Sequence, residues 1–172
     1  MSPAAEPLLR IPLGVVVERR RSASPWTDLV WCGTAVLPDE PDVTPWTLIR
    51  EQDGVALFYA GTATVDLYRS EAGRYSDNLA SRTPSVWIVL SPSEGAWPYV
   101  VAAITADPAE AEAFAEAGAN LVEAVPMPAI VRETIESFIA EHYVERVFVK
   151  RARRRADPEA LAHRSSESGR RQ

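Results

Sequence analysis

Residue types suited to acid–base chemistry gather in one stretch in the middle of the chain, DLYRSEAGRY. The candidate groups are two carboxylates, a guanidinium and a phenol, on Asp66, Arg69, Glu71 and Tyr75. Glu71 and Tyr75 are four residues apart, so a helix here would place both on one face. If the protein is an enzyme, these four residues are the candidate ligand site. We favour a solvated strand face and helix start for the carboxylates, and we assign no catalytic residue.

Nucleophilic and metal-dependent chemistry find little support in the remaining residues. The chain has one cysteine, Cys32, and two histidines, His142 and His163. They do not have the spacing of zinc ligands, so we expect no metal site. Cys32 and His142 could in principle form a nucleophile–base dyad. We favour a packed apolar thiol for Cys32 and a cation near a helix end for His142.

Phosphate chemistry is also disfavoured. The sequence contains neither a G-x-G-x-x-G nor a G-x-x-x-x-G-K-[ST] motif, and Lys150 is its single lysine. Walker-type NTPases and Schiff-base enzymes are therefore excluded unless Lys150 serves. We expect no bound cofactor. Whether the protein is an enzyme stays open, and a binding role is favoured.

Three tryptophans stand beside prolines in predicted loops or at loop edges: Trp26, Trp46 and Trp97. Aromatic side chains in such places anchor protein partners, so these three are candidate partner-binding residues. The alternative is that they cover the edge of a sheet. Trp87, inside the apolar run VWIVL, is expected in the core.

A basic cluster near the C-terminus supplies the other candidate partner-binding residues: Lys150, Arg151, Arg153, Arg154 and Arg155. Residues 1–149 carry 10 Lys and Arg against 21 Asp and Glu, whereas residues 150–172 carry 8 against 3. Such a cluster can bind phosphates, an acidic protein or an anionic membrane surface. The rest of the chain is acidic and no aromatic residue interleaves with the cluster. We therefore favour a solvated tail, then a protein contact, and nucleic acid or membrane last.

Hydrophobic periodicity predicts the strands that must position these residues. An Asp53-Gly54 pair between two strand-like runs predicts a type I′ hairpin turn, and Gly61 is expected to mark a bulge in the second of them. SVWIVLS and PYVVAAIT are expected to pair as a hairpin. The strands are expected over 11–21, 29–38, 46–52, 55–69, 85–91, 98–105 and 121–125.

Helix signals occur in three places. A helix is expected over 70–81 with Ser70 as its N-cap. A second is expected over 107–118, where Asp107, Pro108 and Glu110 form a capping box with proline at the first position. The third is expected over about 128–143. The predicted fold is α+β: a mostly antiparallel sheet, open or curled into a partial barrel, with two helices packed on it near the C-terminus.

Length and composition place these elements in a single domain, residues 10–149. A mobile N-terminus (1–9) is expected before it and a basic disordered tail (150–172) after it. The 172 residues contain one cysteine, so no intramolecular disulfide can form. No apolar run is long enough to span a membrane, and the N-terminus lacks the order of a signal peptide. We therefore expect a cytoplasmic protein.

Four stretches carry a resemblance to a known family: IPLGVVVERR, AGTATVDLYRSEAGRYSDNL, PSVWIVL and VEAVPMPAIVRETIESFIAEHYVERVFVKRARRR. In these stretches, which span about residues 11–155, the chain resembles a bacterial family of unknown function. Members of that family are often encoded beside molybdenum- or tungsten-dependent formate dehydrogenases. The resemblance implies a cytoplasmic accessory protein linked to formate dehydrogenase, and it implies no catalytic residues.

Three functions stay open at this point. The leading hypothesis is a non-enzymatic accessory or binding protein associated with formate dehydrogenase maturation or cofactor insertion, with a formate dehydrogenase subunit as its protein partner. The second is an enzyme of molybdopterin cofactor processing that uses the four residues of the middle stretch. The third is a nucleic-acid-binding regulator that uses the basic cluster. The residues do not predict an oligomeric state.

Overall fold

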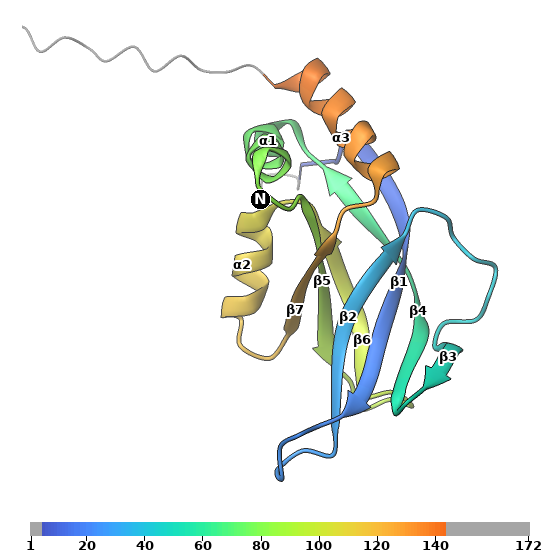
Figure 1. Cartoon of the computed structure of the whole chain (residues 1–172). Helices are drawn as coiled ribbons and strands as arrows, with labels where there is room; N and C mark the ends of the chain where they lie inside the picture. Colours follow the sequence, from blue (N-terminus) through green and yellow to red (C-terminus); the bar gives the residue numbers. More distant parts are fainter. Residues whose placement is uncertain (1–4, 144–172) are drawn as a thin grey trace, which may run out of the picture.

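The chain folds into seven strands and three α-helices, described for residues 5–143 in a computed structural model (Figure 1). Every helix and strand expected in this part of the chain is present, with small differences in the bounds. The strands are β1 (Leu9–Arg21), β2 (Leu29–Leu37), β3 (Thr47–Gln52), β4 (Val55–Leu67), β5 (Ser85–Pro92), β6 (Tyr99–Thr105) and β7 (Leu121–Pro126). The helices are α1 (Ala72–Ala80), which follows the 3₁₀ turn η1 (Arg69–Glu71), α2 (Pro108–Glu116) and α3 (Ala129–His142).

The strands form two antiparallel sheets that face each other. The strand order is β2-β1-β4-β3 in the larger sheet and β6-β5-β7 in the smaller one. The expected α+β class and antiparallel pairing are confirmed. The strands are divided between two sheets and do not form a closed barrel, since no strand of one sheet pairs with a strand of the other in the described chain. The chain passes from β4 through α1 before it enters β5 in the second sheet. β2 lies near β7, and β4 lies near β6.

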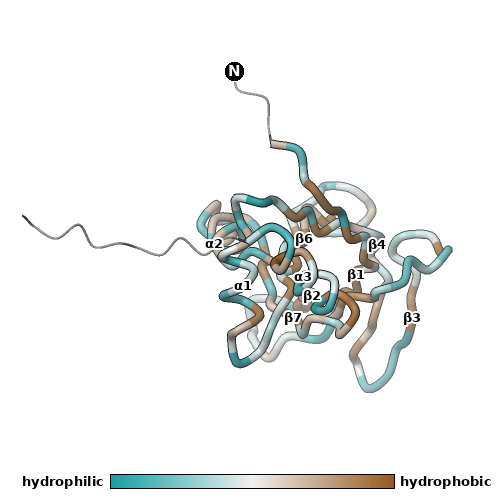
Figure 2. The backbone as a smooth tube through the Cα atoms, turned by 90° about the horizontal axis from the view of Figure 1, so that it is seen from above, coloured by the Kyte–Doolittle hydropathy of each residue, from teal (hydrophilic) through white to brown (hydrophobic). Residues whose placement is uncertain are grey.

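One hydrophobic core fills the space between the sheets. Its strand residues alternate along the sequence, because successive side chains of a strand point to opposite faces. Figure 2 shows the hydrophobic stretches gathered in the middle of the molecule and the hydrophilic ones around them. The residues that β1 and β5 contribute to this core are fully buried: Leu13, Val15, Val17, Val86, Ile88 and Leu90.

The helices cover one end and one face of the sandwich. α1 and α3 pack together at the end, where the rings of Tyr75 and Phe138 meet edge to face at 6.1 Å. α2 lies against the strands of the smaller sheet. Within residues 5–143, no helix is both long enough and apolar enough to cross a membrane.

Local turn and bulge signals in the larger sheet are confirmed. Asp53 and Gly54 have φ values of 53° and 79°, as a type I′ turn requires at both central residues. Gly61 has a φ of 120° and lies where the register between β1 and β4 shifts. This bulge lets β4 bend while it stays paired with β1.

The helix caps are confirmed in one place and wrong in another. Asp107 caps α2, because its carboxylate accepts a hydrogen bond from the Ala109 N–H at 2.9 Å. Ser70 does not cap α1. The chain leaves β4 through the turn η1, so α1 begins at Ala72 and the Ser70 hydroxyl donates to the Glu71 carboxylate.

Candidate functional site

Candidate residues gather at the two ends of the sandwich. A polar group lies where β4 continues into η1 and α1 and where β6 continues into α2. An aromatic group includes Phe58, near the start of β4. Phe58 and Tyr68, which belongs to the polar group, are ten positions apart along mostly extended chain, which corresponds to roughly 30 Å. The two groups are therefore separate surfaces.

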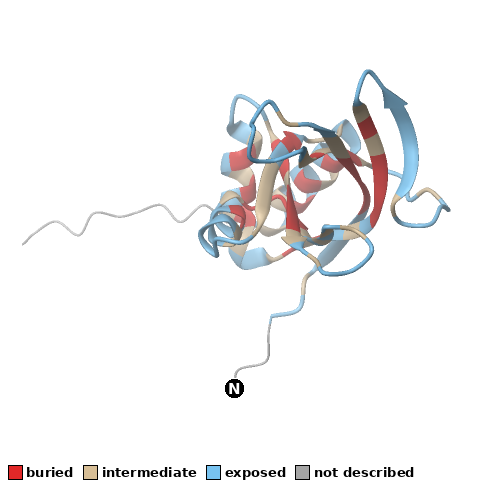
Figure 3. Ribbon diagram, turned by 90° about the horizontal axis from the view of Figure 1, so that it is seen from below, coloured by how far each residue is buried: buried red, intermediate tan, exposed pale blue. Residues whose placement is uncertain are grey.

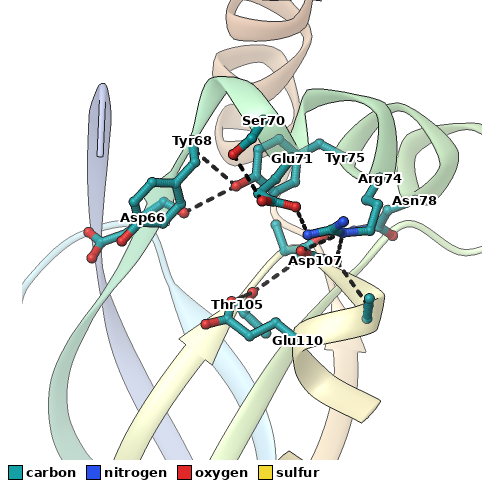
Figure 4. Close-up of polar contacts among 12 residues, drawn as sticks. Asp66, Tyr68, Ser70, Glu71, Arg74, Tyr75, Asn78, Thr105, Asp107 and Glu110 are labelled. Atoms are coloured by element: carbon teal, nitrogen blue, oxygen red, sulfur yellow. Dashed lines mark hydrogen bonds and ion pairs between the residues drawn. The ribbon is translucent and has the colours of Figure 1, made fainter. Parts of the chain in front are cut away.

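The polar group surrounds a cavity of about 360 Å³ at the start of α1 and α2 (Figure 4). Three carboxylates and one guanidinium line it, so the described lining carries a net negative charge. The lining residues are Tyr68, Glu71, Arg74, Tyr75, Asp107, Ala109 and Glu110.

Arg74 joins the two helices across this cavity. Its Nε donates to both carboxylate oxygens of Asp107, at 2.8 and 2.9 Å, and its Nη2 forms an ion pair with Glu71. Asp107 is only 3% exposed and also caps α2. A buried carboxylate needs such partners to offset the cost of removing it from water. The guanidinium of Arg74 is therefore already committed to charges within the protein.

Thr105 connects the backbone of Asp107 to the Glu110 carboxylate at the start of α2. The Asp107 N–H donates to the Thr105 hydroxyl at 3.0 Å, and that hydroxyl donates to Glu110 at 2.5 Å. The expected capping box is corrected in this detail, because Glu110 reaches the backbone of Asp107 through Thr105 and not directly. Thr105 is 3% exposed and Glu110 is exposed, so only the Thr105 end of this contact is shielded from water.

Tyr75 is buried beneath the cavity and holds its hydroxyl between two backbone groups. The hydroxyl accepts from the Tyr68 N–H at 3.1 Å and donates to the Asp66 carbonyl at 3.4 Å. Burial raises the pKa of Tyr75 to about 12, partly opposed by the hydrogen bond from the Tyr68 backbone. The phenol therefore stays protonated near neutral pH, which suits a structural contact better than a general base.

The structure brings together only two of the four residues expected to form a ligand site. Glu71 and Tyr75 line the cavity. The Asp66 carboxylate instead lies 3.6 Å from the Arg10 guanidinium, its cross-strand neighbour on β1, and Arg69 is exposed and outside the lining. Strand alternation explains Asp66, because its side chain points away from the face of its neighbour Leu67, which is in the core.

Several lining residues were not found by sequence reasoning. Arg74 is three residues from Glu71, a spacing that brings them together on a helix, and this signal could have identified it. Asp107 and Glu110 were identified as caps only. The contact between Arg74 and Asp107 joins positions 33 residues apart, which no local pattern predicts.

The aromatic cluster consists of Trp31, Trp46, Phe58 and Trp97. Trp46 and Trp97 are stacked, with ring centroids 5.1 Å apart and an interplanar angle of 14°. Trp97 also lies 5.1 Å from Phe58, and Trp31 lies 5.8 Å from Phe58. Trp46 precedes β3 and Trp97 lies between β5 and β6, so the cluster connects the two sheets.

Arg19 lies against the aromatic cluster from β1. Its guanidinium carbon is 5.8 Å from the Trp31 ring centroid and 5.3 Å from that of Phe58. The same guanidinium is 3.4 Å from the Glu51 carboxylate on β3. A cation over aromatic faces is attracted by their electron density, so Arg19 helps to fix the cluster.

Only two of the three expected partner-binding tryptophans lie in this cluster. Trp46 and Trp97 meet there, and both are partly exposed. Trp26 lies in the loop between β1 and β2 and is 91% exposed. Trp31 and Phe58 were missed because strand positions of this kind usually indicate core residues.

Trp46 has an unusual backbone conformation. Its φ is 68°, in the left-handed region that bulky residues rarely occupy. Its N–H donates to the Tyr59 carbonyl at 2.5 Å, which ties it to β4. Holding such a residue there costs on the order of 1–3 kcal/mol and is typical of functional surfaces.

Cys32 and His142 are not brought together as a dyad. Cys32 pairs with Glu18 on β1, whereas His142 shares a surface pocket with Leu9 at the beginning of β1. Glu18 and Leu9 are nine positions apart along β1, which corresponds to roughly 30 Å of extended strand. Cys32 and His142 therefore lie at different ends of this strand. Burial, followed by the Glu18 and Glu123 carboxylates, raises the pKa of the Cys32 thiol, which favours its uncharged form.

Other candidate residues lie outside the described part of the chain. The basic cluster belongs to this group: Lys150, Arg151, Arg153, Arg154 and Arg155 lie beyond residue 143. Within residues 5–143, no three His, Cys, Asp or Glu side chains are arranged to hold a metal ion.

Comparison with known proteins gives one match. A family model described as "Protein of unknown function (DUF3305)" matches residues 12–153. No curated protein and no solved structure matches the chain.

Proposed function

Because the chain belongs to DUF3305, a family of unknown function, we propose its function from the surfaces that it presents. The protein is a non-enzymatic accessory protein that binds a partner protein through the aromatic cluster. The observation that carries this proposal is the stacked pair of Trp46 and Trp97, held between the two sheets with Trp46 in a strained backbone conformation.

The composition of this surface supports protein binding. Tryptophan and arginine are the residues most enriched where interfaces have their strongest contacts, and Arg19 lies against Trp31 and Phe58. Stacking fixes Trp46 and Trp97 before a partner arrives, which lowers the entropy lost on binding. The polar cavity is less suited to catalysis, because Arg74 and Asp107 are already paired with each other.

The resemblance of the chain supports a choice of partner for this proposal. Relatives encoded beside formate dehydrogenases point to a formate dehydrogenase subunit, and to maturation or cofactor insertion as the process. The basic cluster at residues 150–155 is a second candidate contact. Its charge suits an acidic partner.

Affinity purification from the native cells tests the proposal. Mass spectrometry of the co-purified proteins compares four tagged samples: the wild type, Trp97→Ala, Trp26→Ala and a chain that ends at Val149. We expect a formate dehydrogenase subunit to co-purify with the wild type. With Trp97→Ala, we expect its recovery to fall by about tenfold or more. The shortened chain shows whether the basic cluster contributes.

Ile130→Ala is the matched control, because Ile130 is an exposed apolar residue of α3, far from the aromatic cluster in the fold. It is expected to retain the partner. Circular dichroism confirms that each variant is folded. Failure of the wild type to recover any formate dehydrogenase subunit would reject the proposed partner, and full recovery with Trp97→Ala would reject the aromatic cluster as its binding surface.

A second candidate function is an enzyme of molybdopterin cofactor processing. The observation that favours it is the cavity of about 360 Å³ lined by Glu71 and Tyr75, which falls in the size range typical of small-molecule sites. Calorimetric titration with a pterin tests it. Binding that is lost in Glu71→Gln and Arg74→Ala supports this function, and no heat of binding with the wild type rejects it.

A further inference from the structure

A groove of about 520 Å³ lies between the beginning of β1 and the C-terminal part of α3, at one end of the sandwich (Figure 1). The side chains that α3 contributes to its lining include Thr134, Ser137, Phe138 and His142. Leu8 and Leu9 line it from the other side, and they are 55% and 36% exposed. β1 is exposed at its beginning, whereas its middle is buried (Figure 3). Two neighbouring leucines are therefore open to water beside a buried part of the strand.

The two hydroxyl groups of the groove are already hydrogen-bonded within α3. The Thr134 hydroxyl donates to the Ile130 carbonyl at 2.7 Å, and the Ser137 hydroxyl donates to the Glu133 carbonyl at 3.0 Å. Neither hydroxyl needs a partner from outside the helix. Covering the leucines with apolar side chains removes apolar surface from water, which is favourable. The groove therefore suits an apolar occupant.

The chain supplies an apolar segment directly after α3. The helix ends at His142, which lines the groove, and Tyr143 has an extended backbone with φ −87° and ψ 118°. The next residues, 144–149, lie beyond the described part of the chain and read VERVFV, with four apolar residues among the six. The family match continues through this segment to residue 153. Residues 1–4 hold one large apolar side chain, that of Met1, so the segment after α3 is the better occupant.

The lengths of the segment and the groove agree. Thr134 and His142 are eight positions apart on α3, which corresponds to about 12 Å of helix. Residues 144 and 149 are five positions apart, which corresponds to at most about 17 Å of extended chain. The segment is therefore long enough to cover the groove as soon as the chain leaves α3.

We propose that residues 144–149 turn back at Tyr143 and pack in this groove, with Val147 and Phe148 against Leu8 and Leu9. The segment then extends the hydrophobic core past the end of α3. It also fixes the place from which the basic cluster of residues 150–155 leaves the domain. The docking does not depend on the partner proposed above.

Thiol labelling of the full chain tests whether the groove is filled. On a Cys32→Ser background, Ser137→Cys places a thiol in the groove with little change in side-chain size. We expect it to react with a maleimide about tenfold or more slowly than Ser81→Cys, at an exposed position after α1. Adding Phe148→Ser should raise the rate at Ser137→Cys by about tenfold. Arg153→Ser, just beyond the segment, should leave that rate unchanged.

Disulfide cross-linking locates the segment. Val147→Cys is combined either with Ser137→Cys or with Ser81→Cys. A Cβ added at Gly73 would lie 3.4 Å from the Tyr143 ring, so the chain leaves α3 beside α1. From that point Ser137 is about 9 Å away along α3 and Ser81 about 12 Å away along α1, and a segment that is not docked can reach both. The docked segment should cross-link to Ser137→Cys about tenfold faster than to Ser81→Cys.

Three results would each overturn the docking. The first is equal labelling of Ser137→Cys and Ser81→Cys, which means that the groove is open. The second is slow labelling of Ser137→Cys that Phe148→Ser does not change. In that case, a rate that rises on dilution assigns the groove to a second copy, and a rate that rises on deletion of residues 1–4 assigns it to the N-terminus. The third is equal cross-linking at both positions.

Folding of the variants is measured separately. Circular dichroism and an unchanged labelling rate at Ser81→Cys show whether Phe148→Ser retains the fold. The cross-linking variants keep Phe148, so they test the docking even if Phe148→Ser does not fold.

Discussion

Gly33 on β2 is a residue at which the two sheets touch. A Cβ added there would lie 2.8 Å from the Cβ and Cγ2 atoms of Ile88 on β5. Ile88 is fully buried on the central strand, and close-packed interiors give little room for adjustment. Gly33→Ala is therefore expected to lower the free energy of unfolding by about 1–3 kcal/mol, as measured by urea denaturation.

Gly95→Ala provides the comparison for Gly33→Ala. A Cβ at Gly95 would meet only the Ser93 hydroxyl, at 3.3 Å, in an exposed loop. Its free energy of unfolding is expected within about 0.5 kcal/mol of the wild type. Equal midpoints for the two variants would contradict the close approach of the sheets at Gly33.

Tyr75 makes the stability of the protein depend on pH in the alkaline range. Burial raises its pKa from 10.0 to about 12, so the unfolded chain loses this proton first. The stability contributed by Tyr75 is therefore complete below about pH 10 and is lost as the pH rises toward 12. Denaturation over a series of alkaline pH values should show this decline.

Tyr75→Phe separates this contribution from that of other groups. It leaves the Tyr68 N–H and the Asp66 carbonyl without the hydroxyl, at an expected cost of about 1–3 kcal/mol at neutral pH. Its stability should decline less between pH 10 and 12 than that of the wild type. Tyr143→Phe, at a residue that is 41% exposed, should keep the wild-type profile. If the stability of Tyr75→Phe declined as much as that of the wild type, the decline would come from groups other than Tyr75.

At the scale of elements, the contact between Arg74 and Asp107 connects α1 to the start of α2. Asp107→Ala removes both the cap of α2 and the acceptor of Arg74, and is expected to cost about 1–3 kcal/mol. Asp107→Asn keeps a capping oxygen and loses the charge, so it should cost less. Chemical denaturation of the variants measures both effects.

A double-mutant cycle tests whether this contact couples the two helices. Arg74→Ala combined with Asp107→Ala should cost less than the sum of the single changes, with a coupling of about 1 kcal/mol. The Arg74 side chain is 46% exposed, which limits the free energy that its ion pair with Asp107 contributes. Strictly additive costs would mean that α1 and α2 are positioned by other contacts.

At the scale of the whole molecule, one core joins both sheets and the helices. The aromatic cluster lies at one end of this core, and α1 and α3 lie at the other. Because both ends depend on the same buried residues, unfolding is expected to be cooperative. Tryptophan fluorescence reports unfolding at the end that holds the aromatic cluster, and far-ultraviolet circular dichroism reports unfolding of the whole molecule. The two urea midpoints should coincide, and a clear separation would indicate that the sheets unfold independently.

Local sequence patterns determined most of the elements. Alternation of apolar residues located β1 and β4, the Asp53-Gly54 pair located the hairpin, and Asp107 with Pro108 located the start of α2. These signals act between residues close in sequence, through allowed backbone angles and nearby hydrogen bonds. The start of α1 was missed because Ser70 has the chemistry of a cap, whereas η1 shifts the helix by two residues.

The sequence by itself determined the antiparallel α+β class, the acidic charge of residues 1–149 and the helical spacing of Glu71 and Tyr75. Only the tertiary structure decided that the strands form two sheets, that Arg74 meets Asp107 and that Trp46 stacks on Trp97. These contacts join residues 33 and 51 positions apart. They arise from packing two sheets around one core, and packing depends on the whole chain at once, whereas backbone preferences act within a few residues.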